Sequence, residues 1–362
     1  MGDLGRRIAL ALATLQSQGS PSPLGTLVLA GRHQAAGREL AALAAACGTT
    51  DVRYEPLDAL DPDAVAALLR REQPALILQC ASLLSPWALG ARSSSAAQAL
   101  ASAGFALQLP AQLPILHAIM SAVRSSEFAG PVVNCSYPDV THQVLARQGL
   151  APTIGIGNAG MIAKVIEAGL RRAGTPERVR VLAHHSHVTA AMTAAPARAH
   201  VLAATSAGHP GAAHPRVWLG EEARAADALA YQGPALASSR ELNALSCTHA
   251  VELTLALLGL GPALLTSAPG PHGRPGGWPV RVAQGEVTLA LPQELSQAEA
   301  TAWNQAAAAG DGLERIDDDG TVHFTEAARR ALADHAPALA APLPPTRWRE
   351  RAELLRQYVE AA

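Results

Sequence analysis

The stretch that decides the fold is Gly2-Asp3-Leu4-Gly5-Arg6-Arg7, which runs directly into the apolar segment Ile8-Ala9-Leu10-Ala11-Leu12. Two glycines three positions apart come before a segment in which Ile8, Leu12 and Leu15 share one helical face. Glycines at this spacing let a backbone approach a pyrophosphate and let a helix pack closely on a sheet. The stretch therefore predicts the second half of a dinucleotide-binding turn, with the pyrophosphate on the N-terminus of the helix. The predicted contacts are Gly2, Asp3, Leu4 and Gly5.

Two parts of this turn are missing from the sequence before Gly2: an apolar strand and the first glycine of the fingerprint. The missing strand would lie in the middle of a parallel sheet, where both of its edges are paired. We therefore expect the true start of the protein to lie upstream of Met1. If it does not, we expect a gap in the sheet and weak cofactor binding. The alternative is an ordinary helix near a chain terminus.

The composition bounds the size of the fold and disfavours some partners. The 362 residues suffice for two domains or one large domain, and 49% hydrophobic residues allow a sizeable core. A formal net charge of −2 gives no support for binding to nucleic acid or to a membrane. Because we find no signal peptide and no long, charge-free apolar run, we expect a cytoplasmic protein.

The cysteines favour a reducing compartment. The sequence contains Cys47, Cys80, Cys135 and Cys247, which are far apart and form no C-x-x-C pair. This spacing is typical of buried thiols and not of a disulfide framework or a zinc site.

Residues 26–30 are predicted to form the second strand of a dinucleotide-binding sheet. Arg32 and His33 follow its carboxyl end, where the adenosine ribose lies in this fold. A guanidinium pairs well with a 2′-phosphate, so we predict NADP in preference to NAD. A solvated arginine at the start of a helix is the alternative. Asp58, after a third strand at residues 51–54, is either a contact to the adenine edge or the start of a turn.

The next predicted strand, at residues 75–80, is a continuous apolar run typical of a buried parallel strand. The small residues behind it, Ala81 and Ser82, would let a nicotinamide ribose come close. We therefore predict both as cofactor contacts.

A further strand at residues 131–134 stops abruptly in polar residues. Since ligands collect at the carboxyl ends of strands in open α/β sheets, Asn134 and Ser136 are predicted cofactor contacts. Asp139 is either a site residue or a cap of the next helix.

These segments resemble the nucleotide domain of saccharopine-dehydrogenase-like oxidoreductases. The resemblance rests on GDLGRR, LVLAGR, the D-x-x-D after the third strand and LILQCAS, and it covers roughly the first 135 residues. The later N-x-S-x-P-D pattern is similar to lactate, malate and opine-type dehydrogenases, which place cofactor contacts there. The resemblance implies NAD(P)-linked hydride transfer, often to an imine or keto group of an amino-acid-like substrate.

Three histidines in four residues, His184, His185 and His187, end a strand predicted at residues 179–183. In an extended strand His185 and His187 share one face, so two metal ligands are geometrically feasible, but no nearby carboxylate or cysteine completes a set. General acid–base chemistry is better supported, because hydride transfer to C=O or C=N needs a proton donor. We predict His187 and His185 as catalytic residues, with Asp139 as the orienting carboxylate. Histidines hydrogen-bonded within a polar loop are the alternative.

Two glycine-rich stretches are candidate substrate contacts. The first, at residues 153–161, carries Asn158 and is the predicted passage into a second domain. The second, at residues 266–280, carries His272, Arg274 and Trp278. Arg274 would grip a substrate carboxylate and Trp278 would form a pocket wall, or the stretch is only a rigid turn before a strand. The small, polar residues 189–211 are predicted to form a mobile loop over the site.

The sequence thus predicts an α/β fold with a Rossmann-type parallel sheet and a second α+β domain. The predicted units are a NAD(P)-binding domain at 1–150, a substrate and dimerisation domain at 151–335, and a Pro-rich linker with a C-terminal helix at 336–362. We expect a homodimer that acts on a small molecule and binds neither nucleic acid nor membrane.

The predicted function is an NADP-preferring oxidoreductase that moves a hydride to or from a carbonyl or imine carbon of a small, carboxylate-bearing substrate. Two alternatives stay open. One is a nucleotide-binding sensor without catalysis, and the other is a metal-dependent hydrolase or lyase built on the histidine cluster.

Overall fold

Parallel strands joined by helices form the first half of the chain. The computed structural model describes residues 2–15, 23–88, 94–192 and 212–361, so most of the predicted loop at 189–211 lies outside the described residues. The elements of this half are α1 (Asp3–Ala13), β1 (Thr26–Gly31), α2 (Gln34–Cys47), β2 (Asp51–Pro56), α3 (Pro62–Glu72), β3 (Ile77–Gln79), α4 (Ser95–Ala103), α5 (Leu109–Ser125), β4 (Val132–Asn134), α6 (Pro138–Ala146) and β5 (Ile154–Gly155).

These parallel strands fall into two separate sheets. β1 pairs with β2, while β3, β4 and β5 form a second sheet in that order. Within the described residues no ladder joins β1 to β3. The break lies between the predicted second and fourth strands, which is where the missing strand of the fingerprint was expected.

Antiparallel sheets dominate the second half. β6 (Val179–Leu182), β7 (Arg216–Leu219) and β8 (Arg224–Ala225) form one sheet, and β9 (Leu264–Pro269), β10 (Gly277–Ala283) and β11 (Glu286–Leu289) form another. Helices α7 (Ala159–Arg172) and α10 (Asn243–Leu257) pack against these strands. The predicted α/β fold with a Rossmann-type parallel part and an α+β part is thus confirmed.

Two local features in this half follow directly from their sequence. The hairpin between β10 and β11 turns through Gln284 and Gly285, which both have positive φ, as a two-residue turn with matching twist requires. At the start of α11 (Gln297–Ala307), Ser296 and Glu299 form a capping box.

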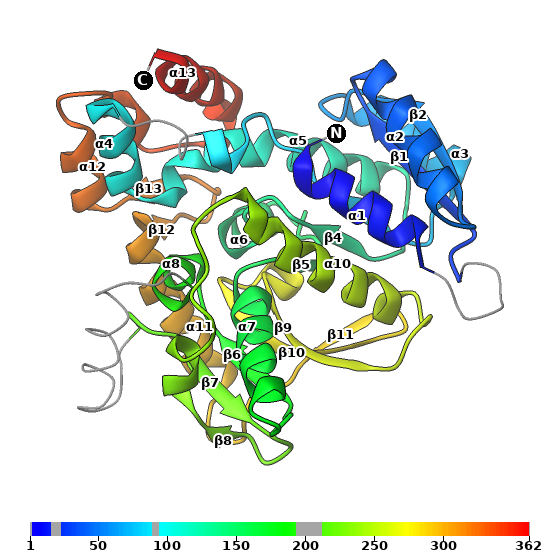
Figure 1. Ribbon diagram of the computed structural model, residues 1–362. Coiled ribbons are helices and arrows are strands. Elements are labelled where there is room, and N and C mark those ends of the chain that lie inside the picture. Colours follow the sequence, from blue (N-terminus) through cyan, green and yellow to red (C-terminus); the bar gives the residue numbers. More distant parts are fainter. Residues whose placement is uncertain (1, 16–22, 89–93, 193–211, 362) are drawn as a thin grey trace.

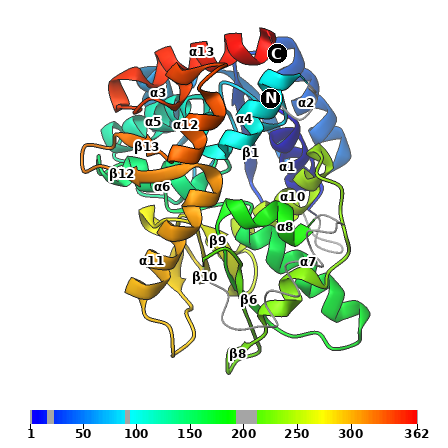
Figure 2. The same ribbon diagram turned by 90° about the vertical axis from the view of Figure 1, so that its left-hand side faces the viewer.

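The C-terminal elements return to the first half of the chain. They are β12 (Leu313–Ile316), β13 (Val322–Phe324), α12 (Glu326–Leu332) and α13 (Trp348–Ala361). In both views α13 lies across the top of the molecule, over α5, whereas β8 lies at the bottom (Figures 1 and 2). Residues between 100 and 150 share one buried core cluster with residues between 313 and 359.

Helix α5 has a proline in its first turn. It begins at Leu109, because Pro110 is accommodated in the first turn where no N–H bond is required. Together with the turn before it, the span Phe105–Ser125 is long and apolar enough to cross a membrane. Its most apolar window is 78% buried inside the fold, as is usual for a core helix.

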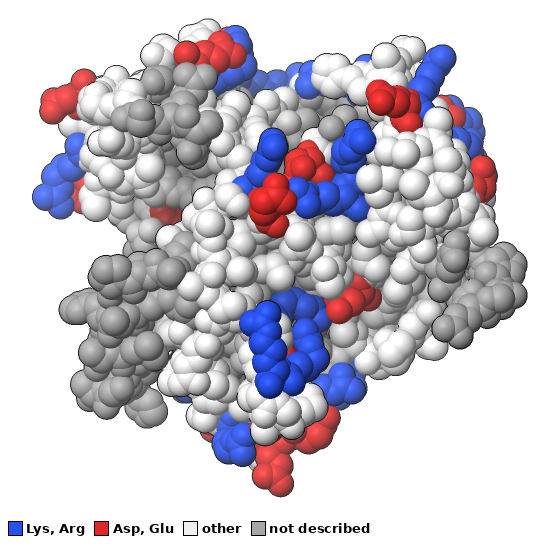
Figure 3. All heavy atoms as spheres, in the orientation of Figure 1, with Lys and Arg blue, Asp and Glu red and all other residues white. Residues whose placement is uncertain are grey.

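On the face shown in Figure 3, charged side chains of both signs gather in separate groups with uncharged areas between them.

Two adjacent leucines of α13 provide a matched test of this packing. Leu355 is fully buried, whereas Leu354 is 36% exposed. Truncation of a fully buried leucine removes apolar contacts and leaves a cavity, so Leu355→Ala should lower the free energy of unfolding by about 2–5 kcal/mol. Leu354→Ala should change it by no more than about 0.5 kcal/mol. Urea unfolding followed by circular dichroism measures both, and equal effects would contradict the docking of α13.

Candidate active site

The histidine cluster is a turn and not the end of an extended strand. β6 ends at Leu182, and His185–His187 form a single 3-10 turn whose N-cap is His184. The prediction that His185 and His187 share one face of a strand is therefore wrong. The turn separates them, because the His184 N–H bonds to His187 Nδ1 at 2.9 Å and closes the loop.

His187 is occupied by contacts within the chain. Its Nδ1 accepts the His184 N–H, and its Nε2 lies 2.9 Å from the Ala212 carbonyl oxygen. Burial lowers the pKa of His187 to about 4, so the ring is neutral at neutral pH. A neutral ring with both nitrogens bonded to backbone groups stabilises the turn and has no free position for a substrate.

His185 has one bonded nitrogen and one open nitrogen. Its Nδ1 lies 3.0 Å from both carboxylate oxygens of Asp311, and its ring stacks on Phe105 at a centroid distance of 4.1 Å. The side chain is 26% exposed, and within the described residues its Nε2 has no hydrogen-bond partner. Burial acts to lower the pKa of His185, but the charge and hydrogen bond of Asp311 outweigh it and raise the pKa above its usual value of 6.5. Nε2 is therefore the position at which this ring can exchange a proton with a substrate.

Asp311 is the carboxylate that orients the cluster. It is 4% exposed and lies in the turn after α11. The Tyr137 hydroxyl donates to its Oδ2 at 2.8 Å, and the His184 Nδ1 lies 3.2 Å from the same oxygen. Burial favours the neutral acid, but His185 and His184 outweigh it and hold the pKa of Asp311 far below its usual range. The carboxylate stays charged, and its charge favours the protonated form of His185.

The sequence contained a signal for Asp311 that the prediction missed. The residue lies in Gly310-Asp311-Gly312, directly after an alanine-rich helix. A Cβ on Gly310 would come within 2.8 Å of the Ser186 Cβ, and Gly312 has a φ of +83°. Both glycines are therefore needed for the carboxylate to approach the histidine turn closely. An aspartate between two such glycines is a stronger candidate for a site carboxylate than an aspartate inside a helix.

Asp139, the predicted orienting group, pairs with Asn158 instead. The Asn158 amide donates to Asp139 Oδ2, and both residues are buried. The pKa of Asp139 is raised by burial, although His184 and His185 act against this. Asp139 Oδ1 and His184 Nε2 are buried and have no hydrogen-bond partner within the described residues. The structure thus brings three predicted site residues near one another, Asp139, Asn158 and His185, and leaves polar atoms there that can bind a substrate group or water.

Asn134 and Ser136 belong to a buried network at the carboxyl end of β4. Asn134 is fully buried, its amide nitrogen contacts His142 Nε2 at 3.1 Å, and its oxygen accepts the Ser136 N–H at 2.9 Å. The Ser136 hydroxyl donates to the Ala81 carbonyl at 2.9 Å, and the Ser82 hydroxyl donates to the Leu84 carbonyl. These groups fix the ends of β3 and β4, and Ala81 itself is exposed there.

The predicted pyrophosphate and ribose contacts lie on an open surface. A Cβ added to Gly2 or to Gly31 would meet no atom within 4 Å, so there is free space before α1 and after β1. Asp3 accepts hydrogen bonds from Asn243 and Arg7, and within α1 Gly5 is buried while Leu4 is half-buried. Arg32 and His33 are exposed, and no hydrogen bond or ion pair is recorded for either side chain among the described residues. Asp58 forms a local turn by accepting the Leu60 N–H.

The glycine- and proline-rich stretch before β10 packs against α6. The Gly276 N–H donates to the Asp139 carbonyl at 3.0 Å, which joins the stretch to the start of that helix. His272 has a φ of +50° and contacts the Val287 carbonyl. Arg274 donates to the Pro271 carbonyl, and its Nε is buried with no partner among the residues that the structure describes. Trp278 is fully buried in the core, and its Nε1 donates to the Pro275 carbonyl. Arg274 therefore retains hydrogen-bonding capacity, whereas the Trp278 ring faces the protein interior.

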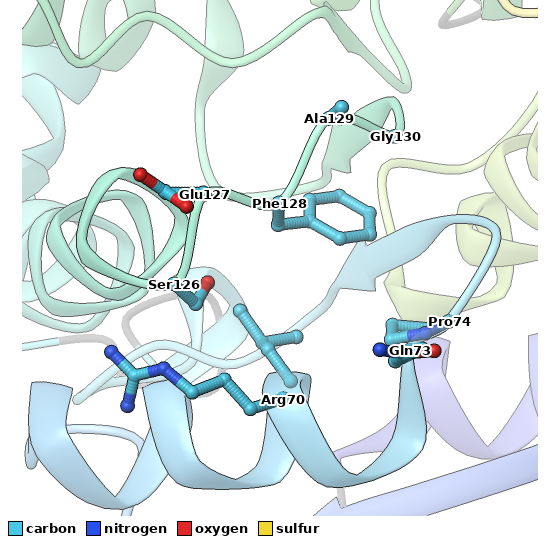
Figure 4. A pocket seen from close by; sticks show the side chains of 9 residues that line it. Arg70, Gln73, Pro74, Ser126, Glu127, Phe128, Ala129 and Gly130 are labelled. Carbon is cyan, nitrogen blue, oxygen red and sulfur yellow. The ribbon is translucent and has the colours of Figure 1, made fainter.

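Other candidate sites are weak. No group of three His, Cys, Asp or Glu side chains is arranged to hold a metal ion in the part of the chain that the structure describes. A surface hollow of about 290 Å³ lies between the end of α3 and the segment after α5, and it is lined by Arg70, Gln73 and residues 126–130 (Figure 4). None of its lining residues belongs to the predicted site.

Comparison with known proteins supports the fold. No family model matches the chain, and no curated protein matches it in sequence. Among solved structures, a candidate glucosidase, lplD from Bacillus subtilis, is similar with a TM-score of 0.53 and 14% identity over 99% of this chain and 96% of that chain. MGS-M5, a lactate dehydrogenase from a Medee basin deep-sea metagenome library, has a TM-score of 0.46 and 14% identity over 92% of this chain and 96% of that chain, which is too low to establish a shared fold. The similarity to the Bacillus subtilis structure indicates a shared fold, and no comparison singles out the saccharopine-dehydrogenase-like family.

The dependence of His185 on Asp311 can be measured directly. In Asp311→Asn the carboxylate charge is lost while burial remains, so the pKa of His185 should fall from above 6.5 to below it. Proton NMR titration of the histidine Cε1–H resonances measures the pKa of His185 in both proteins. As a control, Asp317→Asn removes the carboxylate 2.7 Å from the Nε2 of His323 and should leave His185 unchanged. An unaltered His185 titration in Asp311→Asn would rule out the pair.

Proposed function

We propose that this protein is a NAD(P)-dependent oxidoreductase that prefers NADP and acts on a carbonyl or imine carbon of a small, carboxylate-bearing substrate. One observation carries the proposal: a single partly exposed histidine, His185, is held through Nδ1 by the buried Asp311 beside Tyr137, which follows the carboxyl end of β4. In open α/β folds this edge is where ligands bind. The α/β fold is compatible with this function but does not by itself imply it.

The residues around α1 and β1 fit a dinucleotide. The space before α1 can accept a pyrophosphate on the free N–H groups of its first turn, next to Gly2. In this proposal the exposed Arg32, next to the open position at Gly31, pairs through its guanidinium with a ribose 2′-phosphate. When bound, the nicotinamide supplies or accepts the hydride.

In this proposal the chain itself handles the proton. Asp311 accepts the Nδ1–H of His185, so the exchangeable proton of the protonated ring is on Nε2 at the partly exposed edge. From there it passes to the oxygen or nitrogen of a substrate being reduced, and it returns when the substrate is oxidised. Tyr137 donates to Asp311 and acts as a positioning residue. Arg274, whose Nε has no partner in the described part of the chain, is the proposed carboxylate contact.

The other predictions stand as expectations beside this proposal. We expect a cytoplasmic homodimer with no nucleic-acid or membrane partner. A catalytically inactive nucleotide sensor would bind the cofactor but would not depend on His185. A metal-dependent hydrolase or lyase would instead lose activity with a chelator.

Cofactor preference can be tested by fluorescence titration with NADPH and NADH. Arg32→Ala should raise the Kd for NADPH by about 10- to 100-fold, because a charge-assisted hydrogen bond is worth about 1.5–3 kcal/mol, and should change the Kd for NADH by less than about threefold. Arg38→Ala, on the exposed side of α2, is the control and should affect neither. If the unaltered protein binds neither nucleotide, the oxidoreductase proposal is wrong.

The catalytic role of His185 can be tested by screening 2-keto acids and imines as substrates for reduction by NADPH. His185→Asn should lower kcat by about 10²- to 10⁴-fold and leave the Kd for NADPH within about twofold. Because reduction needs the protonated ring, kcat for reduction should fall as pH rises through the raised pKa of His185, and oxidation should rise over the same range. In Asp311→Asn both profiles should move to lower pH. A fully active His185→Asn enzyme would overturn this role.

A further inference from the structure

Two of the four cysteines lie against each other at the ends of neighbouring strands. The Sγ atoms of Cys80 and Cys135 are 3.4 Å apart. Gln79 of β3 and Asn134 of β4 are paired in the ladder, so Cys80 and Cys135 are the next residues of two adjacent parallel strands. The Cys135 N–H donates to the Gln79 carbonyl at 2.9 Å, which keeps the strands in register up to the thiols.

From this geometry we infer that Cys80 and Cys135 are a redox modification site that closes to a disulfide when a peroxide is present. Neighbouring strands are about 4.8 Å apart, within the Cα separations of about 4.4–6.8 Å that a disulfide spans. The two sulfurs need to approach from 3.4 Å to a bond length of about 2.05 Å. Side-chain rotation with a small strand adjustment provides this approach.

Accessibility and chemistry fit the inference. Both thiols are half-buried, so a small oxidant reaches them, whereas a fully buried pair would be inert. The pKa of Cys135 is raised well above its usual value, first by its hydrogen bond to Cys80 and also by burial. The raised pKa disfavours the thiolate of Cys135. Cys80 is the nucleophile of the pair and Cys135 the resolving thiol.

The reaction balances with a peroxide as the oxidant. The Cys80 thiolate attacks one peroxide oxygen, the O–O bond breaks, and water leaves with Cys80 as a sulfenic acid. The Cys135 sulfur then attacks the Cys80 sulfur, the S–O bond breaks, and a second water leaves. Two thiols lose two protons and two electrons, and hydrogen peroxide is reduced to two water molecules.

Cys247 is a third thiol that could form a disulfide with Cys80 or Cys135, so the test must distinguish its disulfides from the Cys80–Cys135 link. It lies on α10, is half-buried, and is close enough to interact electrostatically with both thiols. Burial raises its pKa, which disfavours its thiolate. Cys47 is exposed on α2 and serves as a control without a thiol neighbour among the described residues.

The experiment treats the full-length protein with hydrogen peroxide and then counts free thiols after denaturation. The unaltered protein should lose two of its four thiols, and non-reducing peptide mapping should identify a Cys80–Cys135 link that dithiothreitol removes. Cys47→Ser and Cys247→Ser should still form this link. Cys135→Ser should trap a dimedone-reactive sulfenic acid on Cys80, whereas Cys80→Ser should give no such label on Cys135.

Two results would overturn the inference. One is a disulfide that contains Cys247 in place of Cys80 or Cys135, and the other is retention of all four thiols in the folded protein under conditions that oxidise free cysteine. Both readouts are chemical and need no nucleotide. Their outcome is therefore independent of whether the proposed oxidoreductase function holds.

Discussion

The buried carboxylate of Asp311 is the interaction on which the candidate site depends. It accepts from Tyr137, after β4, and contacts His184 and His185, after β6, so one side chain joins three segments that are far apart in the sequence. A charge at 4% exposure is costly unless it is fully paired. Removing any one donor would leave part of that free-energy cost uncompensated. Because the charged carboxylate needs the Nδ1–H of His185 as a donor, it fixes both the rotamer and the tautomer of that ring.

Glycines make this convergence sterically feasible. The Gly310–Gly312 turn lies against Ser186 on one side and against the backbone of Ala103 on the other, where Gly104 also has a positive φ of +99°. A side chain at any of these positions would push the carboxylate away from the histidines. The same logic holds at Gly270, whose Cβ would collide with the His142 ring. Close backbone approach thus sets the geometry of the site.

Local features of the fold could be predicted from sequence, and long-range ones could not. The bounds of α2, the β10–β11 hairpin and the capping box at Ser296 follow from periodicity, turn residues and caps, which act within a few residues. The partner of His185 lies 126 residues away, so no spacing rule connects it to the histidine turn. The prediction chose the nearest acidic residue of a polar strand end, Asp139, because a sequence pattern does not record which segments meet in space.

The split of the parallel strands changes what holds the predicted nucleotide turn in place. In an unbroken sheet the strand before the glycine-rich turn would anchor it. Here α1 is positioned from the other half of the chain: it packs along α10, Arg7 pairs with Glu241 at 2.8 Å, and the Asn243 amide donates to Asp3 at 2.9 Å. Exposed pairs of this kind contribute little individually, so the apolar contacts along α10 carry most of the positioning. α1 therefore lies between α10 and α2, so the proposed nucleotide surface adjoins the half of the molecule that carries the histidine turn.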